Sequence, residues 1–229
     1  MYFGSYSLAL IELMKRFLRP GDTFLDVGAN VGYLSAVGAG LVGKSGQVHS
    51  FEPVPAYFRR LERLIALNPG HNIVATPCAA GETKGTAKAY VTLEPGENTL
   101  VPDYAGSETI KECIEVPVIR LDDYIESHGL SHISLIKIDT EGFEFPVLLG
   151  LRRFFERSQR LPAIICEIDP RAYPLLGYKP ADLTSYMAQY GYRACNALNP
   201  ARTVELTSLT NVDDVLFSPP SAAGLSRAA

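Results

Sequence analysis

Apolar and polar positions follow two periods that alternate along the chain. Near the start, Leu10, Leu13, Met14 and Phe17 recur at the spacing of one face of an amphipathic helix, which Pro20-Gly21 ends. Short apolar runs typical of buried strands then alternate with segments of helical period. The predicted strands are 23–27, 47–51, 72–78, 133–138, 163–168, 192–197 and 214–217, and the predicted helices are 31–42, 56–67, 121–128, 143–157 and 180–190.

Strands that alternate with helices at this spacing predict βαβ units on a largely parallel sheet with helices on both faces. The pattern changes within 82–116, where period-two alternation in 87–93 and 113–118 predicts antiparallel strands around a Gly-, Pro- and acid-rich loop, 94–109. We therefore expect one α/β domain. Its predicted parts are a domain over 1–218, an N-terminal helix within 1–19, a hairpin insertion at 82–116 and a flexible tail at 219–229.

Composition is that of an ordinary globular domain, with 229 residues, 47% of them hydrophobic and 20% charged. A net charge of −4 without any run of Lys and Arg argues against a nucleic-acid partner. No apolar run approaches 20 residues, so we expect no membrane span, and Glu12, Lys15 and Arg16 interrupt the first apolar stretch, unlike a signal peptide. The four cysteines lie far apart and form no metal-binding pair, so we expect a cytoplasmic protein.

The first predicted strand ends in the turn Asp26-Val-Gly28-Ala-Asn30-Val-Gly32. Ligands of open α/β sheets bind at the carboxyl ends of the strands, and glycines there allow a sharp turn and close approach to a ligand. A dinucleotide fingerprint that begins at Gly28 would have glycines at 30 and 33, where Asn30 and Tyr33 stand, so a nicotinamide oxidoreductase is disfavoured. The turn suits S-adenosylmethionine (SAM), which has no phosphate and carries a sulfonium cation.

Glu52 strengthens this interpretation, because it ends the second strand, where a carboxylate can accept hydrogen bonds from both ribose hydroxyls. SAM is therefore the predicted cofactor. The predicted cofactor-binding residues are Asp26, Gly28, Asn30, Gly32 and Glu52.

A second polar cluster follows the strand 133–138. Side chains alternate along a strand, so Lys137 and Asp139 point to one face, and a buried Lys137 needs a carboxylate partner such as Asp139 or Glu141. Glu167 adds a further acid at the same edge. One carboxylate, or Lys137 if burial lowers its pKa, could remove a proton from an attacking hydroxyl. Alternatively, Asp139, Glu141 and Glu167 could hold a divalent cation, although we expect no obligatory metal. Helix-start acids beside a snorkelling lysine would give the same pattern without a function.

Four segments resemble, in order, the FkbM family of methyltransferases over about residues 20–168. They are Phe24-Leu-Asp-Val-Gly-Ala-Asn-Val-Gly-Tyr33, Phe51-Glu-Pro53, Leu121-Asp-Asp-Tyr124 and Ile136-Lys-Ile-Asp-Thr-Glu-Gly-Phe-Glu144. The resemblance implies a class I methyltransferase fold, a Rossmann-like three-layer sandwich with a mostly parallel seven-stranded sheet and an antiparallel last strand. It also implies SAM-dependent methyl transfer, commonly to a hydroxyl of a sugar or secondary metabolite, although N-methylating members exist.

Carried over by position, the resemblance implies that Lys137, Asp139 and Glu141 border the reacting centre as catalytic residues, beside the cofactor residues named above. The segment 82–116, where the resemblance fades, is expected to influence acceptor choice, and the loop 94–109 with Tyr104 is a candidate lid. Tyr57, Tyr173 and Tyr178 are candidates for stacking on a sugar. The expected partners are a small-molecule or glycan acceptor and a second copy of the chain in a homodimer. A SAM-binding protein without catalytic activity is the alternative from another class.

Overall fold

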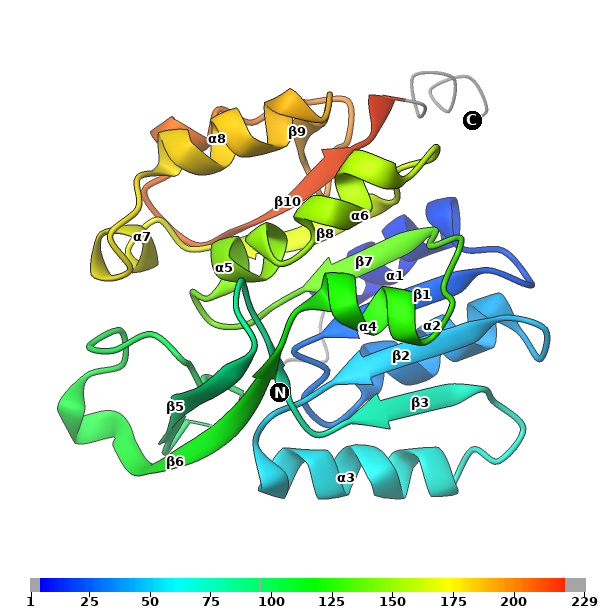
Figure 1. The fold of residues 1–229 in the computed structure, drawn as a ribbon, viewed down its shortest axis with the longest axis horizontal. Coiled ribbons are helices and arrows are strands. Elements are labelled where there is room, and N and C mark those ends of the chain that lie inside the picture. The colour runs from blue at the N-terminus through cyan, green and yellow to red at the C-terminus, as the bar shows by residue number, and fades with distance from the viewer. Residues whose placement is uncertain (1–4, 95, 221–229) are drawn as a thin grey trace.

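The computed structural model describes residues 5–94 and 96–220, which form two sheets (Figure 1). The main sheet has the strand order β3-β2-β1-β7-β8-β10-β9, and the smaller sheet has the order β4-β6-β5. The strands are β1 (Thr23–Val27), β2 (Gln47–Phe51), β3 (Ile73–Thr76), β4 (Ala79–Ala80), β5 (Gly85–Thr92), β6 (Ile110–Ile119), β7 (Leu135–Ile138), β8 (Ala163–Ile168), β9 (Arg193–Asn196) and β10 (Asp213–Ser218). The helices are α1 (Ser5–Phe17), α2 (Tyr33–Val42), α3 (Pro55–Ala66), α4 (Leu121–Ser127), α5 (Glu144–Leu149), α6 (Arg152–Arg157), α7 (Ala172–Leu175) and α8 (Pro180–Gln189), with single 3₁₀ turns η1 (Ser107–Thr109) and η2 (Leu206–Ser208).

Helices cover both faces of the main sheet, as the sequence predicts (Figure 1). On one face, α1 and α2 pack their apolar side chains against strand residues such as Phe24 and Ile165. On the other face, α4, α5 and α8 pack against residues such as Ile136 and Cys166. The strands β3, β2, β1, β7 and β8 are parallel, and β10 is antiparallel to both β8 and β9. The expected three-layer sandwich with an antiparallel last strand is confirmed.

Most predicted elements are present within one or two residues of their predicted ends, and two predictions are wrong. The helix predicted over 143–157 is two helices, α5 and α6. The N–H of Phe154 donates to the Asp122 carboxylate, and the carbonyl of Gly150 accepts from the N–H of Asp122, so the helical bond between Phe154 and Gly150 is not formed. The strand predicted over 72–78 ends at Thr76, because Pro77 has no N–H to continue a ladder, and Ala79–Ala80 then pair with β6 in the smaller sheet.

The carboxyl ends of the parallel strands meet along one edge of the sheet. Strand β1 lies between β2 and β7. From β1 the chain first builds β2 and β3 on one side, and it later adds β7 and β8 on the other side. This change of direction opens a crevice next to the end of β1. Asp26, Glu52 and Asp139, at or next to the ends of these three strands, therefore lie around one crevice.

Three further expectations concern the C-terminal tail, the absence of a membrane-spanning helix and the state of the cysteines. The part of the tail predicted as flexible that follows residue 220 lies outside the described residues. Among residues 5–94 and 96–220, no helix has the length and apolar character needed to cross a membrane. All four cysteines are free.

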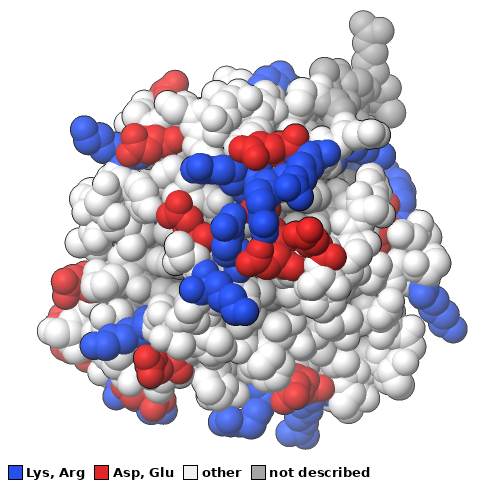
Figure 2. Space-filling model, in the orientation of Figure 1, with Lys and Arg blue, Asp and Glu red and all other residues white. Residues whose placement is uncertain are grey.

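The buried carboxylate of Asp122 joins α4 to α6 beneath a group of charged side chains that Figure 2 shows over these two helices. It accepts hydrogen bonds from the N–H groups of Arg153 and Phe154, at 3.1 and 2.8 Å, and so caps the first turn of α6. It also pairs with the guanidinium of Arg120 at 2.9 Å. The first acid of the Leu121-Asp-Asp-Tyr124 segment, Asp122, thus has a structural role.

We predict that Asp122→Ala lowers the free energy of unfolding by about 2–3 kcal/mol, because two helix N–H groups lose their acceptor. Urea denaturation measures the change. The matched control is Asp123→Ala, since the half-exposed Asp123 pairs only with Arg153 among the described residues, and it should cost less than about 1 kcal/mol. Equal losses for the two variants would contradict the capping role.

Candidate functional site

One cavity lies at the carboxyl ends of β2, β1 and β7. Its walls are the turns that follow these strands, the segment between β3 and β4, and the loop between β5 and β6. Seven of the eight predicted site residues line it. They are Asp26, Gly28, Asn30, Glu52, Lys137, Asp139 and Glu141. The cofactor and catalytic residues predicted from separate motifs are therefore brought together.

The two glycines of the first turn, Gly28 and Gly32, allow close approach of the turn to other parts of the chain. Gly28 has a φ of 82°, and a Cβ atom there would lie 1.7 Å from the backbone oxygen of Asp139. Gly32, with a φ of 88°, does not line the cavity, and its missing side chain accommodates Leu61 of α3, whose Cδ1 would lie 2.5 Å from a Cβ. Gly32 therefore stands behind the cavity wall and accommodates helix packing, and a contact between Gly32 and the cofactor stays a prediction.

Asp26 is almost fully buried, at 1% exposure, and only one of its oxygens is satisfied by the protein. Ser35 donates to Oδ2 at 2.5 Å, and Ser50 in turn donates to Ser35 at 2.9 Å. Oδ1 has no hydrogen-bond partner among the described residues. Burial raises the pKa of this carboxyl, and the nearby charge of Lys137 opposes the rise. An unsatisfied buried acceptor at a cavity wall calls for a donor from a ligand.

Glu52 and Asn30 are fixed to each other on the opposite side of the turn. The carboxylate of Glu52 accepts the N–H of Asn30 on Oε2 and the N–H of Val54 on Oε1, both at 2.9 Å. Each carboxylate oxygen can accept a further bond. The side-chain Oδ1 of Asn30 is buried and has no partner in the part of the chain that the structure describes, and Asn30 itself has a φ of 53°. Burial raises the pKa of Glu52 to about 7.

These acceptors match the chemistry of SAM. Its ammonium group and two ribose hydroxyls are hydrogen-bond donors, and its sulfonium carries a positive charge that acidic side chains would favour. Free acceptor positions on Asp26, Asn30 and Glu52 supply what such donors need. The residues present therefore fit the predicted cofactor.

Lys137 and Asp139 form a partly buried ion pair on the floor of the cavity. Lys137 is 5% exposed, and its Nζ donates to Oδ2 of Asp139. Burial acts to lower the pKa of Lys137, but the charges of Asp139 and Asp26 outweigh it and hold that pKa above its ordinary value. The hypothesis that burial turns Lys137 into a proton acceptor is therefore not supported, and the ammonium is placed to orient Asp139.

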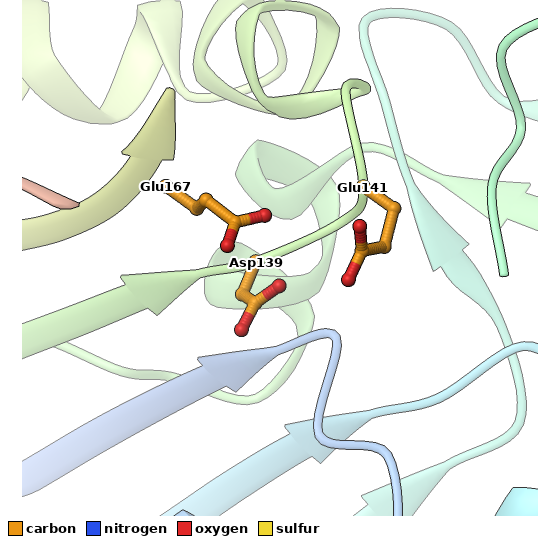
Figure 3. Close-up of side chains that lie close together, drawn as sticks. All are labelled: Asp139, Glu141 and Glu167. Carbon is orange, nitrogen blue, oxygen red and sulfur yellow. The ribbon is translucent and has the colours of Figure 1, made fainter. Parts of the chain in front are cut away.

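The carboxylate of Asp139 also converges with those of Glu141 and Glu167, as Figure 3 shows. Each offers an oxygen within 4.8 Å of the other two. Burial and then the charge of Asp139 raise the pKa of Glu141 to about 8 and that of Glu167 to about 9. Their spacing also suits a hard divalent cation, which is the alternative that the sequence left open.

Glu144, the last acid of the same segment, belongs to the framework of the turn. Its buried Oε1 accepts the N–H and hydroxyl of Thr140 and the N–H of Gly142, at 2.9–3.0 Å. This clamp shapes the turn in which Glu141 adopts a φ of 53°. Glu141 is thereby directed into the cavity while Glu144 is not.

A segment of the β5–β6 loop, which we call the strap (residues 96–104), closes one side of the cavity. Thr99 donates its hydroxyl to the carbonyl of Glu141 at 2.6 Å, and Tyr104 donates its hydroxyl to Asp169. The guanidinium of Arg171 donates to both oxygens of Asp169. Asp169 was not predicted as a site residue, although its position directly after β8 repeats the pattern of Asp139 after β7.

Comparison with known proteins agrees with this geometry. The FkbM methyltransferase domain family matches residues 26–194 of the chain. The chain belongs to this family. It is therefore a SAM-dependent methyltransferase, and SAM rather than a nicotinamide dinucleotide is its cofactor.

Relatives of this FkbM-family protein cover most of its length. It is 31% identical over 183 residues to the 31-O-demethyl-FK506 methyltransferase FkbM of Streptomyces tacrolimicus. This match covers 66% of this chain and 68% of the relative. It is 27% identical over 180 residues to the hexuronic acid methyltransferase AglP of Haloferax volcanii, covering 79% and 67% of the two chains. A solved methyltransferase FkbM from Methylobacillus flagellatus shares the fold at 19% identity with a TM-score of 0.55. That match covers 94% of this chain but only 55% of the other, so this chain spans little more than half of that structure.

We predict that the stability of the ligand-free protein falls as pH rises from about 5 to 9. The folded protein keeps protons on Glu141 and Glu167 that the unfolded chain has released at these pH values, because their pKa values are raised to about 8 and about 9. The free energy of unfolding therefore decreases through this window. Urea denaturation at a series of pH values measures it.

Glu167→Gln should flatten this decrease, because it removes one of the groups that are protonated only in the folded state. The exposed Glu112 of β6 provides the matched control, and Glu112→Gln should leave the pH dependence as in the wild type. Parallel pH profiles for Glu167→Gln and wild type would contradict the assignment.

Proposed function

We propose that the enzyme transfers the methyl group of SAM to a hydroxyl oxygen of a sugar or secondary-metabolite acceptor. The observation that carries the proposal is the Lys137–Asp139 pair at the cavity floor, with Glu141 beside it. The names of two relatives, a 31-O-demethyl-FK506 methyltransferase and a hexuronic acid methyltransferase, support an oxygen as the methyl acceptor.

Four residues hold the cofactor in this proposal. Asp26 and Asn30 accept hydrogen bonds through their free oxygens, Glu52 accepts them from the ribose hydroxyls, and Gly28 leaves the turn open. When bound, SAM supplies an electrophilic methyl group on a positively charged sulfur. The charge of the donor is lost in the reaction, so alignment of the acceptor and exclusion of water are the main tasks of the protein.

Asp139 is the proposed proton acceptor. Its Oδ2 is held by Lys137, while its Oδ1 has no hydrogen bond from the described residues. As the acceptor oxygen forms its bond to the methyl carbon and the carbon–sulfur bond breaks, the hydroxyl proton passes to this carboxylate. Lys137 fixes the carboxylate in position, and Glu141 orients the acceptor at the cavity wall.

The strap is the proposed lid over the reacting groups. Thr99 ties it to the Glu141 carbonyl, and Tyr104 ties it to Asp169, so its closure is coupled to the turn that carries the catalytic acids. Arg171 also lies over the Tyr104 ring, 5.6 Å from its centroid. A closed strap keeps water from the reacting centre.

We further infer a small-molecule or glycan acceptor in a reducing, cytoplasmic setting. The net charge of −4 and the acids around the cavity disfavour a nucleic-acid backbone as acceptor. Four free cysteines are consistent with reducing conditions.

We predict that Asp26→Asn weakens SAM binding about 10- to 100-fold, because it removes a charged acceptor for the cofactor. Asp139→Asn should leave SAM affinity within about 3-fold of wild type and abolish methyl transfer to hydroxylated acceptors. Calorimetry with SAM, and with NAD as a negative control, measures binding, and release of S-adenosylhomocysteine measures transfer. Undiminished transfer by Asp139→Asn would show that the acidic cluster is structural.

Tyr104→Phe should release SAM about 10-fold faster, since the strap loses its hydrogen bond to the buried carboxylate of Asp169. Stopped-flow dissociation measures the rate. Tyr90→Phe is the matched control on the same hairpin, because the Tyr90 hydroxyl makes no hydrogen bond to a described residue, and it should release SAM at the wild-type rate. Identical rates for the two variants would overturn the role of the strap.

A further inference from the structure

A second cavity, with a volume of about 590 Å³, lies away from the methyl-transfer site. Its walls are α4, α6 and the two segments that lead into β7 and β8, so it lies near the amino ends of these strands. The residues that line it are all different from those of the first cavity. Small-molecule sites commonly have volumes of about 300–1,000 Å³. The second cavity is therefore large enough for a ligand of its own.

The inner wall of the second cavity is apolar. Ile125 of α4 and Leu130, which follows this helix, are buried, and Phe154 of α6 is partly buried. These side chains belong to the core cluster beneath α4 and α6 or pack against it. A ring or alkyl chain that covered them would gain about 25 cal/mol for each Å² of apolar surface removed from water. The inner wall therefore favours a ligand with an apolar body.

Two arginines at the rim of this cavity have no acidic partner. The guanidinium groups of Arg157 and Arg160 form no ion pair and no hydrogen bond with a residue that the structure describes. Figure 2 shows basic side chains gathered over α4 and α6, with acids on either side. A guanidinium presents parallel N–H groups that match the two oxygens of a carboxylate. The rim therefore offers free cationic donors to an anion.

The other charges of the cavity leave this positive charge only partly balanced. Asp122 is paired with Arg120 at 2.9 Å. Arg153 is paired with Asp123. Glu126 of α4 is then the remaining acid of the lining, and it has no ion-pair partner among the described residues. One acid set against the two rim arginines leaves a single positive charge, when histidine is counted as neutral.

We propose that the second cavity is a binding site for a small organic carboxylate with an apolar body. Arg157 and Arg160 hold the carboxylate, and Ile125 and Leu130 contact the body. A single unbalanced positive charge favours a monoanion, and the planar guanidinium groups favour a planar carboxylate. Such a ligand binds whether or not the first cavity holds SAM, because the two cavities share no lining residue.

Calorimetric titration of the full chain with three probes tests this site. The probe 2-naphthoate carries both the apolar body and the carboxylate, 2-naphthamide carries the body without the charge, and acetate carries the charge without the body. We expect 2-naphthoate to bind about 10-fold more tightly than either of the others, because each of them lacks one of the two contacts. Equal binding of 2-naphthoate and 2-naphthamide, or no binding of 2-naphthoate, would overturn the proposal.

The double variant Arg157→Gln/Arg160→Gln locates the carboxylate. It should weaken 2-naphthoate binding about 10-fold and leave 2-naphthamide binding unchanged, since only the charged contact is removed. Both arginines are exposed, so the fold should tolerate the change. The matched control is Arg59→Gln/Arg63→Gln, which removes the same charge from exposed, unpaired arginines of α3 and should change neither affinity. Equal losses in the two double variants would reject a contact in the second cavity.

Glu126→Gln tests the charge balance in the opposite direction. It should strengthen 2-naphthoate binding about 3-fold, because the acid that opposes the ligand carboxylate is removed. Glu62→Gln in α3, which removes an exposed acid far from the cavity lining, should leave the affinity as in the wild type. Weaker or unchanged binding in Glu126→Gln would contradict the position of the carboxylate.

A competition experiment separates the second cavity from the first. The titration with 2-naphthoate is repeated in the presence of S-adenosylhomocysteine, and the affinity should be the same as without it. Displacement of 2-naphthoate would mean that the probe occupies the first cavity, which would overturn the proposal.

Discussion

The contact between Gly28 and the backbone of Asp139 sets the geometry on which the rest of the site depends. The N–H of Asp139 donates to the carbonyl of Val27 at 3.0 Å, so the ends of β1 and β7 are joined up to the last residue. Even a methyl group at position 28 would collide with the Asp139 carbonyl. Because the two strand ends are this close, the turn that we propose to receive the cofactor and the carboxylate that we propose as proton acceptor share one rigid frame.

Charge is concentrated around this frame at a cost to stability. The positively charged Lys137 interacts electrostatically with two carboxylates, those of Asp26 and Asp139. Its ammonium therefore offsets part of the repulsion between these two carboxylates. One lysine does not neutralise the further acids Glu141 and Glu167, whose pKa values are raised first by burial and then by the charge of Asp139. Sites that must bind a cation and accept a proton commonly hold groups in such unfavourable surroundings. The apolar clusters on both faces of the sheet stabilise the fold and so offset the cost of these buried charges.

Local periodicity was sufficient to predict the alternating strands and helices, and the strand 163–168 agrees with β8 at both ends. The acids that follow strand ends could also be predicted, since a parallel sheet brings these ends together. Features that depend on partners distant in sequence could not be predicted from local patterns. The break at Gly150 depends on Asp122, and the position of Gly32 depends on Leu61 of α3.

The contacts of the strap also could not be predicted from local sequence. A polar loop was predicted over 94–109, but nothing local indicates that Thr99 binds the Glu141 carbonyl or that Tyr104 binds Asp169. Asp169 itself was detectable in principle, because it directly follows β8 as Asp139 follows β7.

The smaller sheet has a consequence for how such an enzyme can diversify. Strands β5 and β6 pair with each other along most of their length, and the strap connects their far ends. The hairpin can therefore change in length or composition at its tip while the seven-stranded sheet keeps its register. Grafting the tip of one relative onto another would exchange the roof of the site and preserve its floor, which makes the hairpin a natural unit for evolving new acceptor ranges.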